Sequence, residues 1–200
     1  LPLADVVVDL HSGGKTLEFV PSVIMHDLPD RELHAKTLAA LQAFGAPAAA
    51  ILTELDSEGM LDTAVESLGK IFISTELGGA GMTTATTVRI AEQGVRNLLT
   101  HFGVLRDDEV ASSQPGLTLH TPEAGCFIVS HDAGILEMLV ELGDRVVPGQ
   151  PVCQIHHFQE HDREPAVYEA TASGILWCRH VPGLIGRGDC MAVIACDYEL

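Results

Sequence analysis

Hydrophobic positions in the first half of the chain follow two periods, one typical of strands and one typical of helices. Runs of β-branched or small apolar residues predict three strands, at residues 4–10, 48–53 and 70–75. Between them, apolar residues recur at helical spacing and predict three helices, at residues 30–44, at 57–68, and from Thr83 or Thr84 to 102. Strands that alternate with helices favour a sheet flanked by helices.

The third predicted helix carries the longest apolar stripe. Its members recur three or four residues apart and are Val88, Ala91, Val95, Leu98, Leu99 and Phe102. Polar residues that can cap a helix precede two of the other helices, Asp30 and Ser57, and glycines follow them, Gly45 and Gly69. The six apolar residues lie on one face of the predicted helix, which Gly103 ends.

The pattern changes near residues 107–118, a polar stretch with acidic residues, serines and a Pro-Gly pair. No convincing helical period follows it, and short apolar runs are separated by glycine and proline turns. The sequence therefore predicts an α/β part at residues 1–106, a linker at 107–118 and a β-rich domain at 119–200.

Two stretches of the β-rich part repeat each other at an offset of about 40 residues. Gly134-Ile135-Leu136 matches Gly174-Ile175-Leu176, and residues 149–152 match residues 188–191. This predicts a small barrel-sandwich with pseudo-twofold symmetry, which resembles the fold of biotinyl and lipoyl carrier domains. Those carriers modify a lysine, and no lysine follows Lys70, so a swinging-arm carrier is excluded.

Composition adds limits on partners and location. The hydrophobic content of 46% is ample for a packed core, and the formal net charge of −17 argues against nucleic acid or an anionic membrane as partner. Five cysteines without a C-x-x-C pair indicate reduced thiols, and no apolar run reaches membrane-spanning length. We therefore expect a cytoplasmic protein.

The most informative residues stand where the first strand ends. Three valines run into Asp9, then His11, then a Ser-Gly-Gly turn. Side chains alternate along a strand, so Asp9 and His11 project to the same side, and the carboxylate can accept the second N–H of the ring. That arrangement suits a histidine that binds a metal. The alternative is a histidine that caps a loop.

A second strand ends in a similar way at Glu76, before the glycine-rich run Gly78–Gly81. If both strands lie in one sheet with aligned ends, Glu76 and His11 face one crevice. Amide hydrolysis requires a carboxylate beside a metal-activated water, because the carboxylate takes the proton and returns it to the leaving amine. The glycine run itself indicates a tight turn with positive φ.

Rival histidines lie in the β-rich part. Three H-x-x-E matches begin at His120, His157 and His161, and His156 stands beside them. The cluster of His156, His157 and His161 is the strongest rival metal site, although a solvated loop is the favoured interpretation. The other histidines, such as His26, are taken as structural or surface residues.

At these residues the chain resembles the succinylglutamate desuccinylase/aspartoacylase family. The resemblance rests on Asp9-Leu10-His11 with Ser-Gly-Gly, on Glu76-Leu77-Gly78-Gly79 after a strand, and on the β-rich domain that follows. It implies a zinc-carboxypeptidase-like catalytic domain and zinc-dependent hydrolysis of an N-acyl amino acid. The ectoine-catabolic members, which deacetylate N-α-acetyl-L-2,4-diaminobutyrate, are the most similar.

The resemblance also implies roles by position. His11 would be the last of three protein ligands of one Zn²⁺ ion, Asp9 its support and Glu76 the general base. The family's first two ligands come from an H-x-x-E motif upstream of D-L-H, which is not among these residues, so we expect residues 1–200 alone to bind zinc poorly and to be inactive. Another acyl-amino-acid deacylase, a non-catalytic ligand-binding module, a structural metal at the histidine cluster and a homo-oligomer stay open as alternatives.

Overall fold

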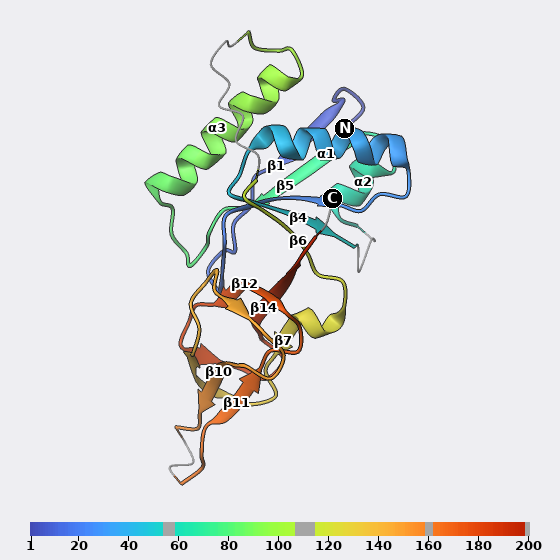
Figure 1. Cartoon of the computed structure of the whole chain (residues 1–200). Helices are drawn as coiled ribbons and strands as arrows, with labels where there is room; N and C mark the ends of the chain where they lie inside the picture. Colours follow the sequence, from blue (N-terminus) through green and yellow to red (C-terminus); the bar gives the residue numbers. More distant parts are fainter. Residues whose placement is uncertain (54–58, 107–114, 159–161, 199–200) are drawn as a thin grey trace.

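The computed structural model describes residues 1–53, 59–106, 115–158 and 162–198. Its first part alternates strands and helices (Figure 1). The elements are β1 (Val6–Asp9), β2 (Leu17–Phe19), β3 (Ser22–His26), α1 (Arg31–Phe44), β4 (Ala48–Leu52), α2 (Leu61–Glu66), β5 (Ile71–Glu76) and α3 (Ala85–His101). The predicted strands and helices are all present, whereas β2 and β3 were not expected.

The helix ends follow from local chemistry. The Asp30 carboxylate accepts hydrogen bonds from the backbone N–H groups of Glu32 and Leu33, and Gly45 ends α1 in the left-handed conformation. Thr84 caps α3 through the N–H of Thr87. Ser57, the expected cap of α2, lies outside the described residues, and Met60 takes the capping position without a side-chain bond.

The strands of this part form a mixed sheet in the order β1-β5-β3-β4-β6, where β6 is Leu117–His120. β1 and β5 are parallel, β3 runs antiparallel to β5, and β4 is parallel to both β3 and β6. α1 packs on β3 and β5 and also contacts α3. The parallel pair β1 and β5 places the carboxyl ends of both strands at one edge of the sheet.

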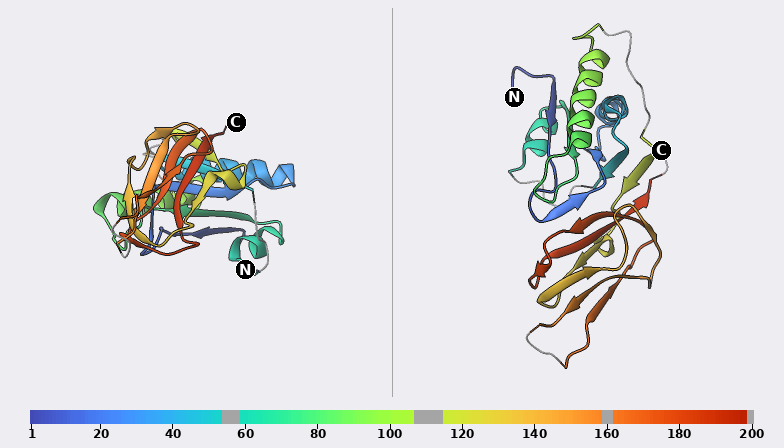
Figure 2. Two further views of the ribbon diagram at one scale, coloured as in Figure 1. Left: turned by 90° about the horizontal axis from the view of Figure 1, so that it is seen from below. Right: turned by 90° about the vertical axis from the view of Figure 1, so that its left-hand side faces the viewer.

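The second part is built almost entirely of short strands (Figure 2). After the 3₁₀ turn η1 (Ala124–Cys126) come β7 (Phe127–Val129), β8 (Gly134–Met138), β9 (Arg145–Val146), β10 (Pro151–His156), β11 (Ala166–Glu169), β12 (Gly174–His180), β13 (Leu184–Ile185) and β14 (Cys190–Asp197). A four-stranded sheet, β11-β10-β8-β13, faces a layer that contains β7, β14, β12 and β9. Val152, Ile155, Leu176 and Met191 are among the fully buried residues between the layers.

The internal repeat is visible in the strand pairing. β8 pairs with β10, and the equivalent β12 pairs with β14. The short strands are exchanged between the two units, since β9 pairs with β12 while β13 pairs with β8. Glycines begin both units for the same reason: a Cβ at Gly134 or Gly174 would lie within 2.3 Å of a backbone oxygen of the paired strand. The α/β sheet with a barrel-sandwich-like domain confirms the expected fold class.

The two parts share strands. β14 pairs with β6, and β2 leaves the first part to pair with β12. A common apolar cluster joins Ile24 and Ala50 of the first part to Trp177 and Val193 of the second. Residues 107–114 of the expected linker lie outside the described residues, and β6 crosses its expected end, so the division into domains stays a prediction.

The apolar stripe of α3 is only partly buried. Of the predicted apolar stripe, only Leu98 is buried, whereas Val88, Leu99 and Phe102 are between 37% and 39% exposed. The helix instead packs through Gly94 and Asn97, whose amide donates a hydrogen bond to the carbonyl of Phe44. Because Gly94 lies against Phe44 of α1, most of the apolar stripe does not face the contact between the two helices.

Among the described residues, no helix is long and apolar enough to cross a membrane. All five cysteines are free thiols, and Cys126, Cys153 and Cys178 are buried. Burial raises the pKa of Cys153 to about 12, as expected for a thiol that packs as a small apolar side chain.

Candidate active site

The sheet brings His11 and Glu76 to neighbouring strand ends. In the parallel β1–β5 pair, Asp9 lies opposite Ser74. His11 and Glu76 each come two residues after this pair, so they lie at corresponding positions of the two strand ends. The backbone N–H of His11 donates to the Thr75 hydroxyl at 3.0 Å, and the N–H of Leu77 donates to the His11 carbonyl at 3.0 Å. These bonds fix the loop after β1 against the end of β5.

Asp9 and His11 are in direct contact, as the alternation of strand side chains predicted. His11 Nε2 lies 2.8 Å from Asp9 Oδ2, and their side chains are 56% and 32% exposed. No partner of His11 Nδ1 is found in the described part of the chain. The carboxylate therefore orients the ring and leaves one nitrogen free to act as a ligand.

Glu76 is the last residue of β5, and its carboxylate is largely removed from water. Its Oε2 atom is buried without a hydrogen-bond partner among the described residues. Burial raises the pKa of Glu76 to about 7, and the nearby His11 ring partly offsets this effect. A carboxyl group with a pKa near neutrality can both accept and donate a proton at physiological pH.

Two glycine turns lie beside these side chains. Gly78 and Gly81 have φ of 73° and 67°, which bears out the expected tight turn. The Gly81 N–H donates to the carbonyl of Gly14, and the Gly13 N–H donates to that of Gly78. A Cβ at Gly79 would lie 2.0 Å from the Leu17 carbonyl oxygen. Only glycine permits this contact, so the loops after β1 and β5 are locked together.

The β-rich part supports this loop pair through an ion-pair network. Glu18 of β2 forms a backbone bridge with Gly79, and its carboxylate accepts hydrogen bonds from Arg179 of β12 at 2.8 and 2.9 Å. Arg179 also donates to Glu141 at 3.1 Å. Sequence reasoning missed Glu18 and Arg179, because no local pattern predicts that β2 pairs with a strand about 160 residues away. It also missed Thr75, whose hydroxyl contacts the backbone of His11, 64 residues away in the chain.

The histidine cluster of the β-rich part does not assemble from the described residues. His156 Nε2 lies 2.6 Å from Glu137 on an exposed surface, whereas the His157 ring is buried and its Nε2 has no hydrogen-bond partner among the described residues. His161 lies outside the described residues. Within the described ranges, no three His, Cys, Asp or Glu side chains are grouped so that they could hold a metal.

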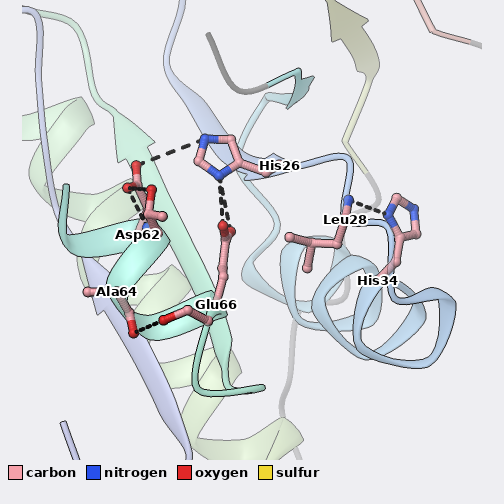
Figure 3. A network of polar contacts seen from close by, with 8 residues as sticks. His26, Leu28, His34, Asp62, Ala64 and Glu66 are labelled. Atoms are coloured by element: carbon pink, nitrogen blue, oxygen red, sulfur yellow. Dashed lines mark hydrogen bonds and ion pairs between the residues drawn. The ribbon is translucent and has the colours of Figure 1, made fainter. Parts of the chain in front are cut away.

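Another histidine, His26 at the end of β3, has carboxylate partners that the sequence did not predict (Figure 3). Its Nδ1 lies 3.0 Å from Glu66, and its Nε2 lies 3.9 Å from Asp62, both on α2. β3 is antiparallel to β5 with Ser22 opposite Glu76, so His26 is about 13 Å further along the strand, away from Glu76. These contacts tie α2 to the sheet, and the cluster is separate from the candidate active site.

Comparison with known proteins agrees with this geometry. The model of the Succinylglutamate desuccinylase/Aspartoacylase catalytic domain matches residues 1–102, which include Asp9, His11 and Glu76. The chain belongs to this family. The succinylglutamate desuccinylase/aspartoacylase family consists of metal-dependent amidohydrolases.

Several relatives of known name or structure cover nearly the whole chain. N-alpha-acetyl-L-2,4-diaminobutyric acid deacetylase of Halomonas elongata is 41% identical over 195 residues, which are 98% of this chain and 57% of that protein. The product-bound structure of the ectoine utilization protein EutE (DoeB) from Ruegeria pomeroyi is 41% identical with a TM-score of 0.92, and the match covers 98% of this chain and 59% of that one.

A succinylglutamate desuccinylase structure from Silicibacter sp. TM1040 is 46% identical with a TM-score of 0.92, again over 98% of this chain and 59% of the other. The chain thus spans less than three fifths of the length of these relatives. The match covers 98% of this chain in each case, so both the α/β part and the β-rich part are shared with these relatives.

Proposed function

We propose that this chain contributes the proton-transfer carboxylate and one metal ligand to a zinc-dependent deacylase that hydrolyses N-α-acetyl-L-2,4-diaminobutyrate. The observation that carries the proposal is the pairing of an Asp9-oriented His11 with a half-buried Glu76 whose pKa is about 7, at adjacent strand ends. Membership of a family of amidohydrolases and 41% identity to a diaminobutyric acid deacetylase support it.

The residues present fit a metal ion. His11 Nδ1 has no partner among the described residues, Glu76 has an orphaned oxygen and is close enough to His11 for their charges to interact, and an imidazole held by a carboxylate is a common zinc ligand. A bound zinc ion supplies Lewis acidity, which polarises an amide carbonyl and makes water a better nucleophile. Since the described residues bring together no group of three ligands, we expect residues 1–200 alone to bind zinc weakly.

Glu76 moves the proton. As a carboxylate it takes a proton from the attacking water while the water oxygen bonds to the amide carbon. The protonated Glu76 then delivers that proton to the amine nitrogen as the carbon–nitrogen bond breaks, which leaves acetate and the free diamino acid. A pKa near 7 suits both halves of this cycle.

The test is Glu76→Gln in the native protein, with any residues that it carries beyond these 200. The amide keeps the shape of the side chain but cannot accept the proton, so turnover of the acetylated diamino acid should fall ~10²–10⁴-fold while the zinc content, measured by elemental analysis, is unchanged. Glu123→Gln, an exposed site of the same chemistry, serves as the control. Normal turnover of the Glu76→Gln protein would remove this residue from the mechanism.

A second substrate is favoured by one comparison, the 46% identity to a protein named succinylglutamate desuccinylase. Parallel assays with the acetylated diamino acid and with N-succinylglutamate separate the two. Preference for the succinyl compound would revise the acyl group, whereas turnover of neither, with zinc bound, would favour the non-catalytic binding module.

A further inference from the structure

The backbone of His11 lies beyond the last regular pair of a terminal strand. β1 stands at one end of its sheet and pairs only with β5 among the described strands (Figure 1). The regular pairing ends at Asp9 opposite Ser74, two residues before His11. The His11 side chain is 56% exposed, so packing does little to fix it. The position of the ring therefore depends on the hydrogen bonds that the His11 backbone makes.

Thr75 of β5 makes two of these bonds with one hydroxyl group. The hydroxyl accepts a hydrogen bond from the His11 N–H at 3.0 Å and donates one to the His11 carbonyl at 3.1 Å. The same carbonyl also accepts from the Leu77 N–H at 3.0 Å, which is possible because a carbonyl oxygen has two lone pairs. Thr75 is fully buried, and β5 lies between β1 and β3. The buried hydroxyl thus uses its donor and an acceptor position on a single residue, His11.

The register of the two strands shows what this hydroxyl replaces. In a parallel ladder that continued past Asp9, the His11 N–H would donate to the carbonyl of Thr75, and the His11 carbonyl would accept from the N–H of Leu77. The second bond is present, whereas the His11 N–H donates to the side-chain oxygen of Thr75. A side chain therefore takes part in the ladder at the residue that would bind the metal.

Thr75 and Glu76 project to opposite faces of β5, because side chains alternate along a strand. Thr75 can therefore hold the His11 backbone without filling the space beside the Glu76 carboxylate. Asp9 constrains the other end of the residue, since its carboxylate lies 2.8 Å from Nε2 of the His11 ring. The backbone and the ring of His11 are thus held by two different residues.

We propose that Thr75 is a positioning residue for the metal centre, whose hydroxyl fixes the His11 backbone so that the imidazole is in place before the metal binds. This inference rests on the proposed function, in which His11 is a metal ligand. Preorganisation raises affinity, because the protein then has less ordering to do on binding. Without the hydroxyl, the His11 N–H turns to water and the loop after β1 loosens, while the preceding pairs of β1 and β5 stay formed.

The experiment measures zinc affinity in the native protein, with any residues that it carries beyond these 200. Metal-free protein is titrated with Zn²⁺ in competition with a chromophoric chelator. Thr75→Val keeps the shape of the side chain and removes the hydroxyl, so the affinity should fall by ~10–100-fold, as for other groups that orient a metal ligand. Thr75→Ser keeps the hydroxyl and should retain most of the affinity. Thr37→Val, the same change at a fully buried threonine of α1, is the matched control and should bind zinc like the wild type.

Two further measurements separate positioning from simple stabilisation. A hydroxyl that only stabilises the fold would lower the free energy of unfolding in urea and leave the zinc affinity unchanged, which would overturn the proposal. In metal-free protein, the His11 amide should exchange with solvent about tenfold faster in Thr75→Val than in the wild type, because local opening becomes easier. An unchanged exchange rate would also overturn the proposal.

If Thr75→Val does not fold, Thr75→Ala and Thr75→Ser provide the test, because they differ by one oxygen atom. Equal zinc affinities of these two variants would overturn the proposal, as would an equal loss in Thr37→Val. His11→Ala distinguishes this failure from that of the proposed function. Full zinc affinity in His11→Ala would remove His11 as a ligand and overturn both, whereas weakened binding in His11→Ala beside normal binding in Thr75→Val would overturn the role of Thr75 alone.

Discussion

At the scale of single residues, the environment of Glu76 favours the protonated carboxyl group. Its pKa of about 7 in the folded chain lies above the ordinary value of 4.5, chiefly because of burial. Between these values the folded state binds more protons than the unfolded state, so stability contributed by this group is fully present below pH 4.5 and is lost as the pH rises through 7.

Glu76→Gln removes this pH dependence. In metal-free protein, the free energy of unfolding of the variant minus that of the wild type should therefore rise by about 1–2 kcal/mol from pH 4.5 to 7.5. This figure allows for solvent screening of a partly exposed group. Urea denaturation at both pH values measures the difference. Glu123→Gln, at an exposed glutamate, is measured beside it as the control. If the stability difference between Glu76→Gln and the wild type were the same at both pH values, the Glu76 carboxyl group would be solvated.

Much of this site was accessible from local sequence. The two-residue spacing of Asp9 and His11 on a strand predicted their contact, and the position of Glu76 at the end of a β-branched run predicted its place beside a glycine turn. The raised pKa could not be predicted, because it depends on how completely the surrounding chain excludes water. Arg179 and Glu18 could not be predicted either, since their pairing depends on the contact between β2 and β12.

At the scale of elements, the contact between α1 and α3 depends on the absence of a side chain. A Cβ at Gly94 would lie 2.3–2.5 Å from ring atoms of Phe44, which is 1% exposed. In an open helix, glycine to alanine stabilises by about 1 kcal/mol. Here the overpacking cost of ~1–3 kcal/mol should exceed that gain.

Gly94→Ala should therefore lower the free energy of unfolding by up to about 2 kcal/mol, as measured by chemical denaturation. A smaller side chain at position 44 relieves the clash. Gly94→Ala should therefore lower the free energy of unfolding by less in a Phe44→Leu background than in the wild type. A stabilised Gly94→Ala protein, or equal costs in both backgrounds, would show that the helices separate freely at this point.

Periodicity predicted the type and position of these helices but not which face of α3 packs. The apolar stripe pointed to Val88 and Leu99, whereas a glycine and an asparagine make the contact with α1. β2 was missed because it has only three residues and follows the Gly13-Gly14 turn, and β3 was missed because it follows Pro21 directly and its residues do not alternate between apolar and polar. Their pairing with β12, β5 and β4 stabilises them, and that information is not local.

At the scale of the whole molecule, the two parts are joined by shared strands and a shared core. β14 and β6 continue the sheet into the β-rich part, and Trp177 of β12 lies in one apolar cluster with Ile24 and Ala50. The indole N–H donates to the Ser22 hydroxyl at 2.8 Å across this junction. Since neither part buries this surface alone, we expect them to unfold together.

The only tryptophan of the chain reports on that junction directly. Its fluorescence and the far-UV circular dichroism of the whole chain should therefore change at the same denaturant concentration. Ser22→Ala leaves the buried indole N–H without an acceptor, which lowers the free energy of unfolding by about 1–3 kcal/mol. The fluorescence and circular dichroism transitions should therefore both move to the same lower denaturant concentration. Ser173→Ala, at an exposed serine of the β-rich part, should leave them in place. If the fluorescence midpoint shifted while the circular dichroism midpoint did not, the β-rich part would unfold on its own. The contact of Arg179 with Glu18, which supports the glycine loop beside Glu76, would then be independent of the stability of the α/β sheet.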